Sequence, residues 1–184
     1  MQAPSGHMTA PVVQALLTDR TLAGEWALDP RTSSIRLTSR AMWGLVPVNG
    51  VFREVSGNGT VSPDGRVSGT VTVAAASIDT KNTRRDTHLR SADFFDSGNN
   101  PDITFPADGI RLSGQRVAVT GALTVRDRTR PLSVDAAASA PADGEIWLDA
   151  QVRINRADFG LTWNLMGMAG VNNTLTVHAV FTRR

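Results

Sequence analysis

Residues 116–125 read RVAVTGALTV, and this stretch decides the fold class. Its apolar positions, interrupted once by Gly121, are Val117, Val119, Leu123 and Val125. Apolar side chains at every second position give a strand with one face in the core and one face in water. Antiparallel sheets use such strands, so the stretch predicts a half-buried strand of an antiparallel sheet.

The same two-residue period recurs along the chain on both sides of this stretch. Its further apolar positions are Ile35, Leu37, Val71, Val73, Leu132, Val134, Ile146, Leu148, Val152, Ile154, Leu175, Val177, Ala179 and Phe181. Turn-forming residues separate these runs at 57–59, 63–65, 113–114 and 143–144. Many short strands joined by tight turns predict an all-β sandwich or an up-and-down barrel, and periodicity does not choose between the two.

Two segments depart from the strand pattern. Apolar residues within 9–19 recur at spacings of one, three and four, which predicts a short N-terminal helix that ends before Gly24. Residues 83–91 predict a second short helix, with Thr83 and Asp86 as a capping box and Asp86 paired with Arg90 one turn on. We therefore divide the chain into residues 1–8, expected to be disordered or left over from cloning, a helical extension 9–23, and a β domain 24–184.

Composition excludes several classes of function. The formal net charge is only +2, and Arg and Asp are interspersed without a basic run, so no nucleic-acid partner is expected. The chain has no cysteine, no histidine cluster, no nucleophile elbow and no phosphate-binding glycine loop, so we expect no metal, no cofactor and no catalytic residue. No apolar run reaches the length of a spanning helix, and no signal peptide is recognisable, which predicts a cytoplasmic location.

Several motifs in a fixed order resemble the signature of the YceI-like family, and the resemblance runs from about Gly24 to the C-terminus. They are WALDP at 26–30, SIDT at 77–80, RD at 85–86, HLRS at 88–91, DFFD at 93–96, ITF at 103–105, GALTV at 121–125, TRP at 129–131, INR at 154–156, DFGL at 158–161 and WN at 163–164. The stretch 42–48 resembles a cytosolic branch of that family. The chain departs from the family pattern at Thr32 and Ala41, where many members carry histidine.

The resemblance implies a closed, eight-stranded, lipocalin-like antiparallel barrel with no established catalytic residues. Family members hold polyisoprenoid or other long-chain lipids in an apolar interior. A long-chain apolar lipid, of the polyisoprenoid, isoprenoid quinone or fatty acid derivative type, is therefore the expected partner. Many family members form dimers, so a homodimer is also an expectation.

A lipid in such a barrel would contact the inward-facing side chains. These are predicted to be Ile35, Leu37, Val71, Val73, Ile103, Phe105, Val117, Val119, Leu123, Leu132, Val134, Ile146, Leu148, Val152, Leu175, Val177 and Phe181. Flexible apolar loops supply the candidate portal residues Trp43, Leu45, Trp163, Leu165, Met166 and Met168. Arg85 and His88 are candidate contacts for a lipid headgroup.

Alternatives remain open at this point. The inward stripe is equally the pattern of an ordinary filled core, which would leave an interaction domain without a ligand. An enzyme acting on a small apolar substrate in the same cavity is a further alternative, which would need an inward titratable group. The loops would then serve as plugs, and the N-terminal helix either covers the barrel mouth or packs on an outer wall.

Overall fold

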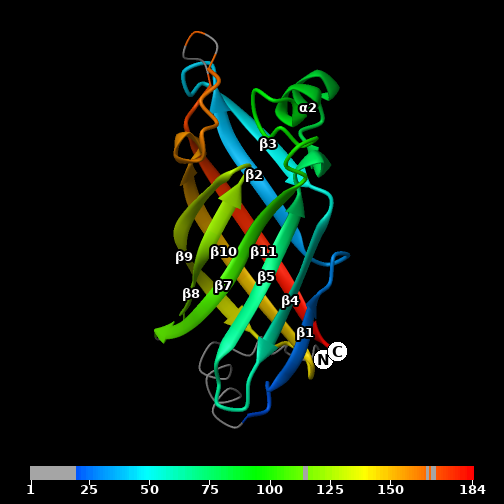
Figure 1. The fold of residues 1–184 in the computed structure, drawn as a ribbon. Coiled ribbons are helices and arrows are strands. Elements are labelled where there is room, and N and C mark those ends of the chain that lie inside the picture. Colours follow the sequence, from blue (N-terminus) through cyan, green and yellow to red (C-terminus); the bar gives the residue numbers. More distant parts are fainter. Residues whose placement is uncertain (1–19, 114–115, 165, 167–168) are drawn as a thin grey trace, which may run out of the picture.

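The computed structural model describes residues 20–113, 116–164, 166 and 169–184, and they form the predicted antiparallel barrel (Figure 1). The strands are β1 (Gly24–Leu28), β2 (Ser34–Ala41), β3 (Val46–Phe52), β4 (Val55–Val61), β5 (Val67–Ala74), β6 (Ile78–Asp79), β7 (Asp102–Ser113), β8 (Arg116–Val125), β9 (Arg128–Ser139), β10 (Glu145–Asn155) and β11 (Asn172–Arg183). Within the described residues, the helix α2 (Thr83–Arg90) and the short 3-10 turns η1 (Ala75–Ser77) and η2 (Arg156–Phe159) join them.

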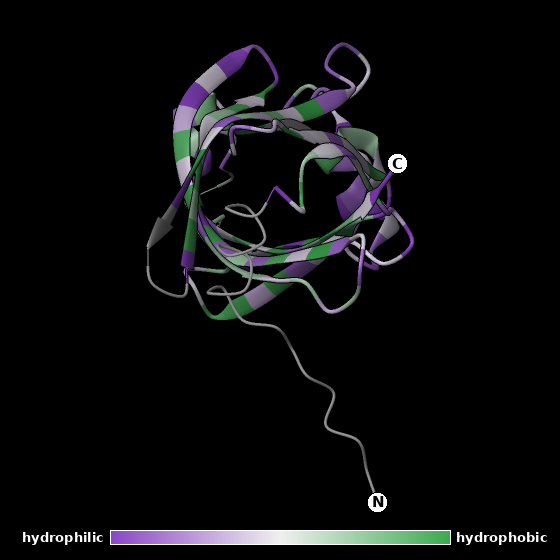
Figure 2. Cartoon of the chain, turned by 90° about the horizontal axis from the view of Figure 1, so that it is seen from below, coloured by the Kyte–Doolittle hydropathy of each residue, from purple (hydrophilic) through white to green (hydrophobic). Residues whose placement is uncertain are grey.

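Eight of these strands close into a ring, in the order β1, β4, β5, β7, β8, β9, β10, β11. The ring closes where β1 pairs with β11, with Trp26 opposite Arg183 and Leu28 opposite Phe181. Figure 2 shows the closed ring from below. The structure thereby decides between the two all-β alternatives, because closure leaves the ring without an edge strand.

The wall of the barrel has two tiers on one side. β11 pairs with β1 near its C-terminal end and with β2 further back, and the wall continues from β2 to β3 and β6. Asp29 N–H donates to the Val180 carbonyl at 2.8 Å where β1 gives way to β2, and Arg53 N–H donates to the Ser77 carbonyl at 3.1 Å beside the joint of β3 and β4. We call β2, β3 and β6 the upper tier, which lies above the ring in Figure 1.

Helix α2 ends one residue before its predicted end, and its cap differs from the prediction. The N-cap is Asn82, whose Oδ1 accepts a hydrogen bond of 3.0 Å from the Arg85 amide, while Thr83 is already the first helical residue. The predicted capping box of Thr83 and Asp86 is therefore wrong. Asn82 fits the cap equally well by residue type, and the 83–86 spacing alone did not exclude it.

The predicted ion pair between Asp86 and Arg90 is also wrong. Asp86 is buried, and its Oδ1 accepts hydrogen bonds from the hydroxyl and the amide of Thr80. Arg90 donates to the carbonyls of Ala76 and Ile78, at 2.7 and 2.9 Å. Asp86 thus binds the residue directly after β6, and Arg90 binds η1 and β6, so both side chains attach the helix beside the open edge of β6.

The N-terminal extension is described only in part. Residues 1–19, which carry the predicted helix and its alternative roles as a lid or a wall cover, lie outside the described residues. Residues 20–22 form a turn, and Leu22 is buried against the lower end of the barrel. Along the part of the chain that the structure describes, no helix has the length and apolar character needed to cross a bilayer.

Candidate functional site

A cavity of about 590 Å³ lies inside the barrel. It extends from Trp26, at the end where β1 begins, to Trp163 in the loop between η2 and β11, and every strand of the ring contributes to its lining. Ligand pockets in proteins commonly have volumes of about 300–1,000 Å³, so this cavity is large enough for one slender ligand. The alternative of a filled core is therefore wrong.

All of the side chains predicted to point inward line this cavity. They are Ile35, Leu37, Val71, Val73, Ile103, Phe105, Val117, Val119, Leu123, Leu132, Val134, Ile146, Leu148, Val152, Leu175, Val177 and Phe181. Several of them, such as Leu132, Leu148 and Leu175, are only half-buried although they face the interior. They are half-buried because they border empty space, and their contact with a ligand stays a prediction.

The lower end of the cavity is closed by Trp26. Its ring is 2 % exposed, and its indole Nε1 donates to the Leu22 carbonyl at 3.0 Å. The guanidinium of Arg183 lies 5.1 Å from the centre of the same ring. Trp26 belongs to a buried apolar cluster with Leu22, Val61 and Val117 at this end.

The upper end of the cavity carries a cluster of aromatic rings around His88. The His88 ring meets Trp163 edge to face at 4.3 Å between centres and meets Phe94 at 5.3 Å. His88 Nε2 lies 3.2 Å from Asp93 Oδ2. All three rings line the cavity, so this end offers both aromatic faces and a polar group to a ligand.

Arg156 is a functional candidate that the sequence reasoning missed. Its side chain lines the upper cavity and is 6 % exposed, and burial lowers the pKa of its guanidinium. Its Nε donates to the Gly170 carbonyl at 2.9 Å and its Nη2 to the Ala169 carbonyl at 3.1 Å, and Nη1 donates to Leu161. It therefore fastens the loop between η2 and β11 to the barrel.

Within the described residues, no carboxylate forms an ion pair with Arg156. Its guanidinium is stabilised by neutral groups, the backbone carbonyls named above. The guanidinium lies 5.6 Å from the centre of the Phe94 ring, a cation–π distance. The motif INR at 154–156 contains Arg156 and was the one indication in the sequence that this arginine has a role. The two-residue period of a strand does not predict where the Arg156 side chain points, because β10 ends at Asn155 and η2 begins at Arg156.

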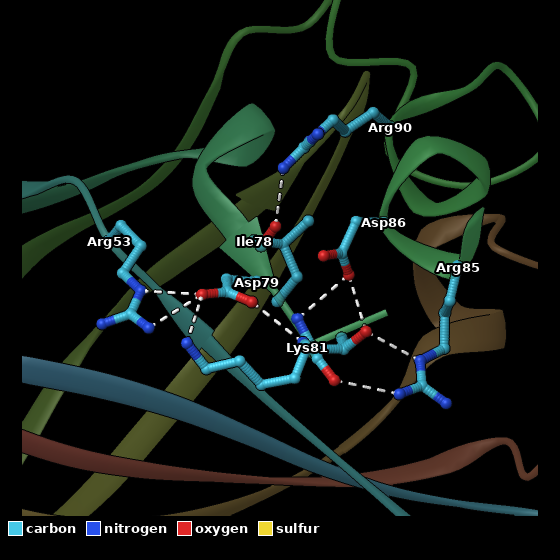
Figure 3. A network of polar contacts seen from close by, with 8 residues as sticks. Arg53, Ile78, Asp79, Lys81, Arg85, Asp86 and Arg90 are labelled. Carbon is cyan, nitrogen blue, oxygen red and sulfur yellow. Dashed lines mark hydrogen bonds and ion pairs between the residues drawn. The ribbon is translucent and has the colours of Figure 1, made fainter. Parts of the chain in front are cut away.

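Arg85, a predicted headgroup contact, also lines the cavity. Its Nε donates to Thr80 Oγ1 at 2.7 Å and its Nη2 to the Thr80 carbonyl at 3.0 Å (Figure 3). The structure thus brings Arg85, His88 and Arg156 to the cavity lining, from α2 and from the start of η2. Contact of Arg85 or His88 with a headgroup stays a prediction.

Asp79 has a structural environment and lies outside the cavity lining. The Arg53 guanidinium donates to its Oδ2 at 2.8 Å, and the Lys81 amide donates to its Oδ1 at 2.9 Å (Figure 3). Arg53, followed by Lys81, holds the pKa of the Asp79 carboxyl well below its ordinary value. These contacts give Asp79 a structural role at the end of β6, where its carboxylate accepts from the backbone two residues on.

The predicted portal residues divide into two groups. Trp163 lines the cavity, whereas Trp43, Leu45 and Met166 project into solvent with exposed fractions of 70, 80 and 80 %. Leu165 and Met168 lie outside the described residues. Passage of a ligand through this region stays a prediction.

The described residues contain no group of three or more His, Cys, Asp or Glu side chains able to hold a metal ion. The lining is predominantly apolar, with its charged side chains at the upper end. Chemically, this arrangement can bury a long apolar chain and can hold a polar or anionic end group beside His88 and Arg156.

The model of the YceI-like domain matches residues 26–182 of the chain. Among curated proteins, Protein YceI of Escherichia coli O6:H1 is 33% identical over 101 residues, which are 52% of this chain and 52% of that protein. The chain thus spans about half the length of the curated relatives it matches.

Two solved structures have the same fold. BcnA of Burkholderia cenocepacia superposes with a TM-score of 0.75 at 22% identity, over 83% of this chain and 98% of that chain. A polyisoprenoid binding domain from Saccharophagus degradans superposes with a TM-score of 0.73 at 15% identity, over 86% of this chain and 98% of that domain. At these identities the likeness shows the fold.

Proposed function

The chain belongs to the YceI-like domain family, and from that premise we propose that it binds a long-chain apolar lipid inside its barrel. The ligand class is a polyisoprenoid or an isoprenoid quinone, with a fatty acid derivative as the nearest alternative. Binding serves to sequester or transport the lipid, and the protein performs no chemistry on it. The observation that carries the proposal is the apolar cavity of about 590 Å³ along the barrel axis.

The energetics favour such a ligand. A lipid chain that buries about 400 Å² of apolar surface gains roughly 10 kcal/mol, at about 25 cal/mol per Å², before the cost of association. This gain needs no polar contact along the chain. The half-buried lining residues, among them Leu132, Leu148 and Leu175, supply the surface that a ligand would cover.

The form of the cavity supports an elongated ligand held from one end. Trp26 fills the lower end, and the charged and polar lining groups Arg85, His88 and Arg156 gather at the upper end. A lipid with an apolar tail and a polar head fits with its tail toward Trp26. The structure from Saccharophagus degradans that shares the fold is described as a polyisoprenoid binding domain, which supports this ligand class.

An enzyme alternative would have to use His88, the titratable group of the cavity nearest in type to a general acid or base. Its Nε2 lies 3.2 Å from Asp93, and Phe94 and Trp163 enclose its ring. These contacts hold the ring in the wall of the cavity, and the other charged side chains among the described residues of the lining, Arg40, Arg85 and Arg156, offer no carboxylate as a second acid or base.

The test is the lipid content of the purified protein. We expect organic extraction and mass spectrometry of the wild type to give a long-chain lipid close to equimolar with protein. Val177→Trp places a large ring into the cavity and should reduce the extracted lipid several-fold, because Val177 lines it. Thr176→Trp is the matched control, since Thr176 is the exposed neighbour on β11 and its side chain points away from the cavity.

The two outcomes are distinct. A lipid present in the wild type and in Thr176→Trp but depleted in a folded Val177→Trp supports the proposal. Absence of any lipid in the wild type, together with no uptake of a prenyl or fatty acyl probe, overturns it.

A further inference from the structure

The exposed apolar side chains of this protein gather at one end of the barrel. Among the described residues, the exposed large hydrophobic side chains are Met42, Trp43, Leu45, Val46, Met166 and Val171. They belong to the loop 42–45 between β2 and β3, to the first residue of β3, and to the loop 160–171 between η2 and β11; the two loops project at the same end in Figure 1. We call this set the apolar rim.

The two loops form one continuous surface. The Gly170 amide donates to the Arg40 carbonyl at 2.8 Å, and Ala41 pairs with Ala169 in a β-bridge. A Cβ on Gly170 would lie 2.8 Å from the Arg40 carbonyl oxygen, so the loops approach as closely as a glycine allows. The rim is therefore a single structural unit.

The rim is continuous with the mouth of the cavity. Met42, which belongs to the rim, also lines the cavity, as do Ala41, Ala169 and Gly170 directly beside it. A surface that touches the rim thus lies at the upper end of the cavity, where the polar lining groups are.

The backbone of the rim is unfavourable for the residues it carries. Met42 and Trp43 have φ values of 50° and 55°, and Met166 has a φ of 54°. Side chains other than glycine, asparagine and aspartate rarely occupy this left-handed region, because the Cβ crowds the backbone. Large apolar residues here cost conformational energy and also expose apolar surface to water.

The two segments that carry the rim contain basic residues and no acidic ones, and acidic side chains at this end, such as Asp93 beside His88, lie outside these segments. Residues 34–52, which form β2, β3 and the loop between them, contain Arg36 and Arg40 and no Asp or Glu, and residues 160–172 contain no charged residue. Arg36 and Arg40 are both exposed. Arg40 Nη1 donates to the Gly44 carbonyl at 3.0 Å, so its charge is held at the base of the loop that carries Trp43.

We propose that the apolar rim docks the protein on the surface of an anionic lipid bilayer, with the upper end of the cavity facing the membrane. A projecting apolar loop with a tryptophan inserts into the headgroup region, and the arginines behind it attract anionic headgroups. A second copy of this chain fits less well, because a symmetric contact through the rim brings the Arg40 side chains of both copies together. The purpose of docking, exchange of cargo with the membrane, rests on the proposed function.

The experiment measures sedimentation of the protein with vesicles of phosphatidylcholine, with and without phosphatidylglycerol. We expect the wild type to bind the anionic vesicles, and binding to weaken in high salt. The variant Trp43→Gly with Leu45→Ser should reduce the partition coefficient about tenfold or more, since it removes the two most apolar exposed side chains of the loop. Glycine suits the φ of 55° at Trp43, so this variant should unfold at the same or a higher temperature than the wild type.

A matched pair of variants tests the charge. Arg40→Gln should weaken binding to anionic vesicles several-fold, and Arg111→Gln, an exposed arginine on β7, should leave it unchanged. Equal vesicle binding by the wild type and the Trp43→Gly with Leu45→Ser variant would overturn the proposal, as would no binding by the wild type. A dimer in analytical ultracentrifugation that this variant abolishes, without vesicle binding by the wild type, would assign the rim to a second copy instead.

The outcome is separable from that of the lipid extraction. A protein that carries lipid but ignores vesicles overturns docking alone. A protein that binds vesicles through the rim but never holds a lipid overturns the proposed function alone.

Discussion

The carboxylate of Asp86 and the side chain of Thr80 form a buried pair that joins α2 to the residue directly after β6. Thr80 Oγ1 donates to Asp86 Oδ1 at 2.6 Å, and the Thr80 amide donates to the same oxygen at 3.0 Å. Both residues are buried, with exposed fractions of 7 % for Asp86 and 5 % for Thr80. The Asp86 carboxylate therefore helps to hold α2 at the upper end of the cavity, together with the hydrogen bonds of Arg90 to Ala76 and Ile78.

Replacing Asp86 by alanine is expected to lower the free energy of unfolding by about 2–4 kcal/mol, because it leaves the Thr80 amide and hydroxyl buried without that acceptor. Chemical denaturation measures the change. Asp135→Ala, at an exposed position on β9, is the control and should change stability by less than about 0.5 kcal/mol. Equal effects of the two variants would show that the buried pair contributes no special stability.

Replacing Arg156 by methionine is expected to loosen the loop between η2 and β11 while the ring stays folded. Three of the carbonyl acceptors of that loop, on Leu161, Ala169 and Gly170, lose their donor. Hydrogen exchange at the Gly170 amide should become at least about tenfold faster, as for a region that opens locally. Exchange at Val73 in β5 is the internal control, and acceleration at both sites alike would contradict a local role. Arg156→Lys should restore little, because one ammonium cannot reproduce the planar set of donors.

Gly121 marks a close approach of β7 and β8, and alanine at this position is expected to destabilise the barrel by about 1–3 kcal/mol. A Cβ on Gly121 would lie 2.3 Å from the Pro106 carbonyl oxygen and 3.0 Å from the Ala107 Cα, so the two strands would have to separate. Gly59→Ala is the control, since its Cβ would lie 3.6 Å from the nearest atom, at an ordinary contact distance. Thermal unfolding of both variants measures the difference, and a lower midpoint for Gly59→Ala than for Gly121→Ala would refute it.

The Asp79 carboxylate is expected to contribute stability that depends on pH. Its pKa in the folded state is depressed, chiefly by the hydrogen bond from Arg53, below its ordinary value of about 3.8. The contribution is therefore fully present above about pH 4 and is lost as the pH falls from there toward the depressed value. The difference in unfolding free energy between wild type and Asp79→Asn should shrink over this acidic range, as measured by urea denaturation. A constant difference from neutral to strongly acidic pH would contradict this origin.

The sequence predicted the barrel lining well because the period of a strand is two. A shift of one residue would turn every apolar side chain of a run outward, so alternation fixes which residues face inward. Val117 and Val119, or Val177 and Leu175, line the cavity for this reason. Whether the inward residues meet one another or border empty space depends on the width of the ring, which alternation does not encode.

The upper end was predicted less well because its contacts join distant parts of the chain. Arg156 acts on backbone carbonyls up to 14 residues further along, and Asp86 binds a residue before its own helix. Local rules assigned Asp86 to the nearest cation on the helix, Arg90, but burial against β6 gave both side chains other partners. The spacing of residues along the chain cannot predict hydrogen-bond partners that come together only when the barrel closes.

The division of the wall into two tiers has a consequence for local unfolding. The upper tier of β2, β3 and β6 pairs with the ring through the ladder between β2 and β11, so those strands can separate while the eight strands of the ring keep their pairings with one another. Fraying at the mouth would break only hydrogen bonds above the joints near Asp29 and Arg53. The barrel can therefore widen at its upper end by local unfolding of a few strands while the lower end stays folded. In that case the amides of β3 exchange with solvent before those of β4.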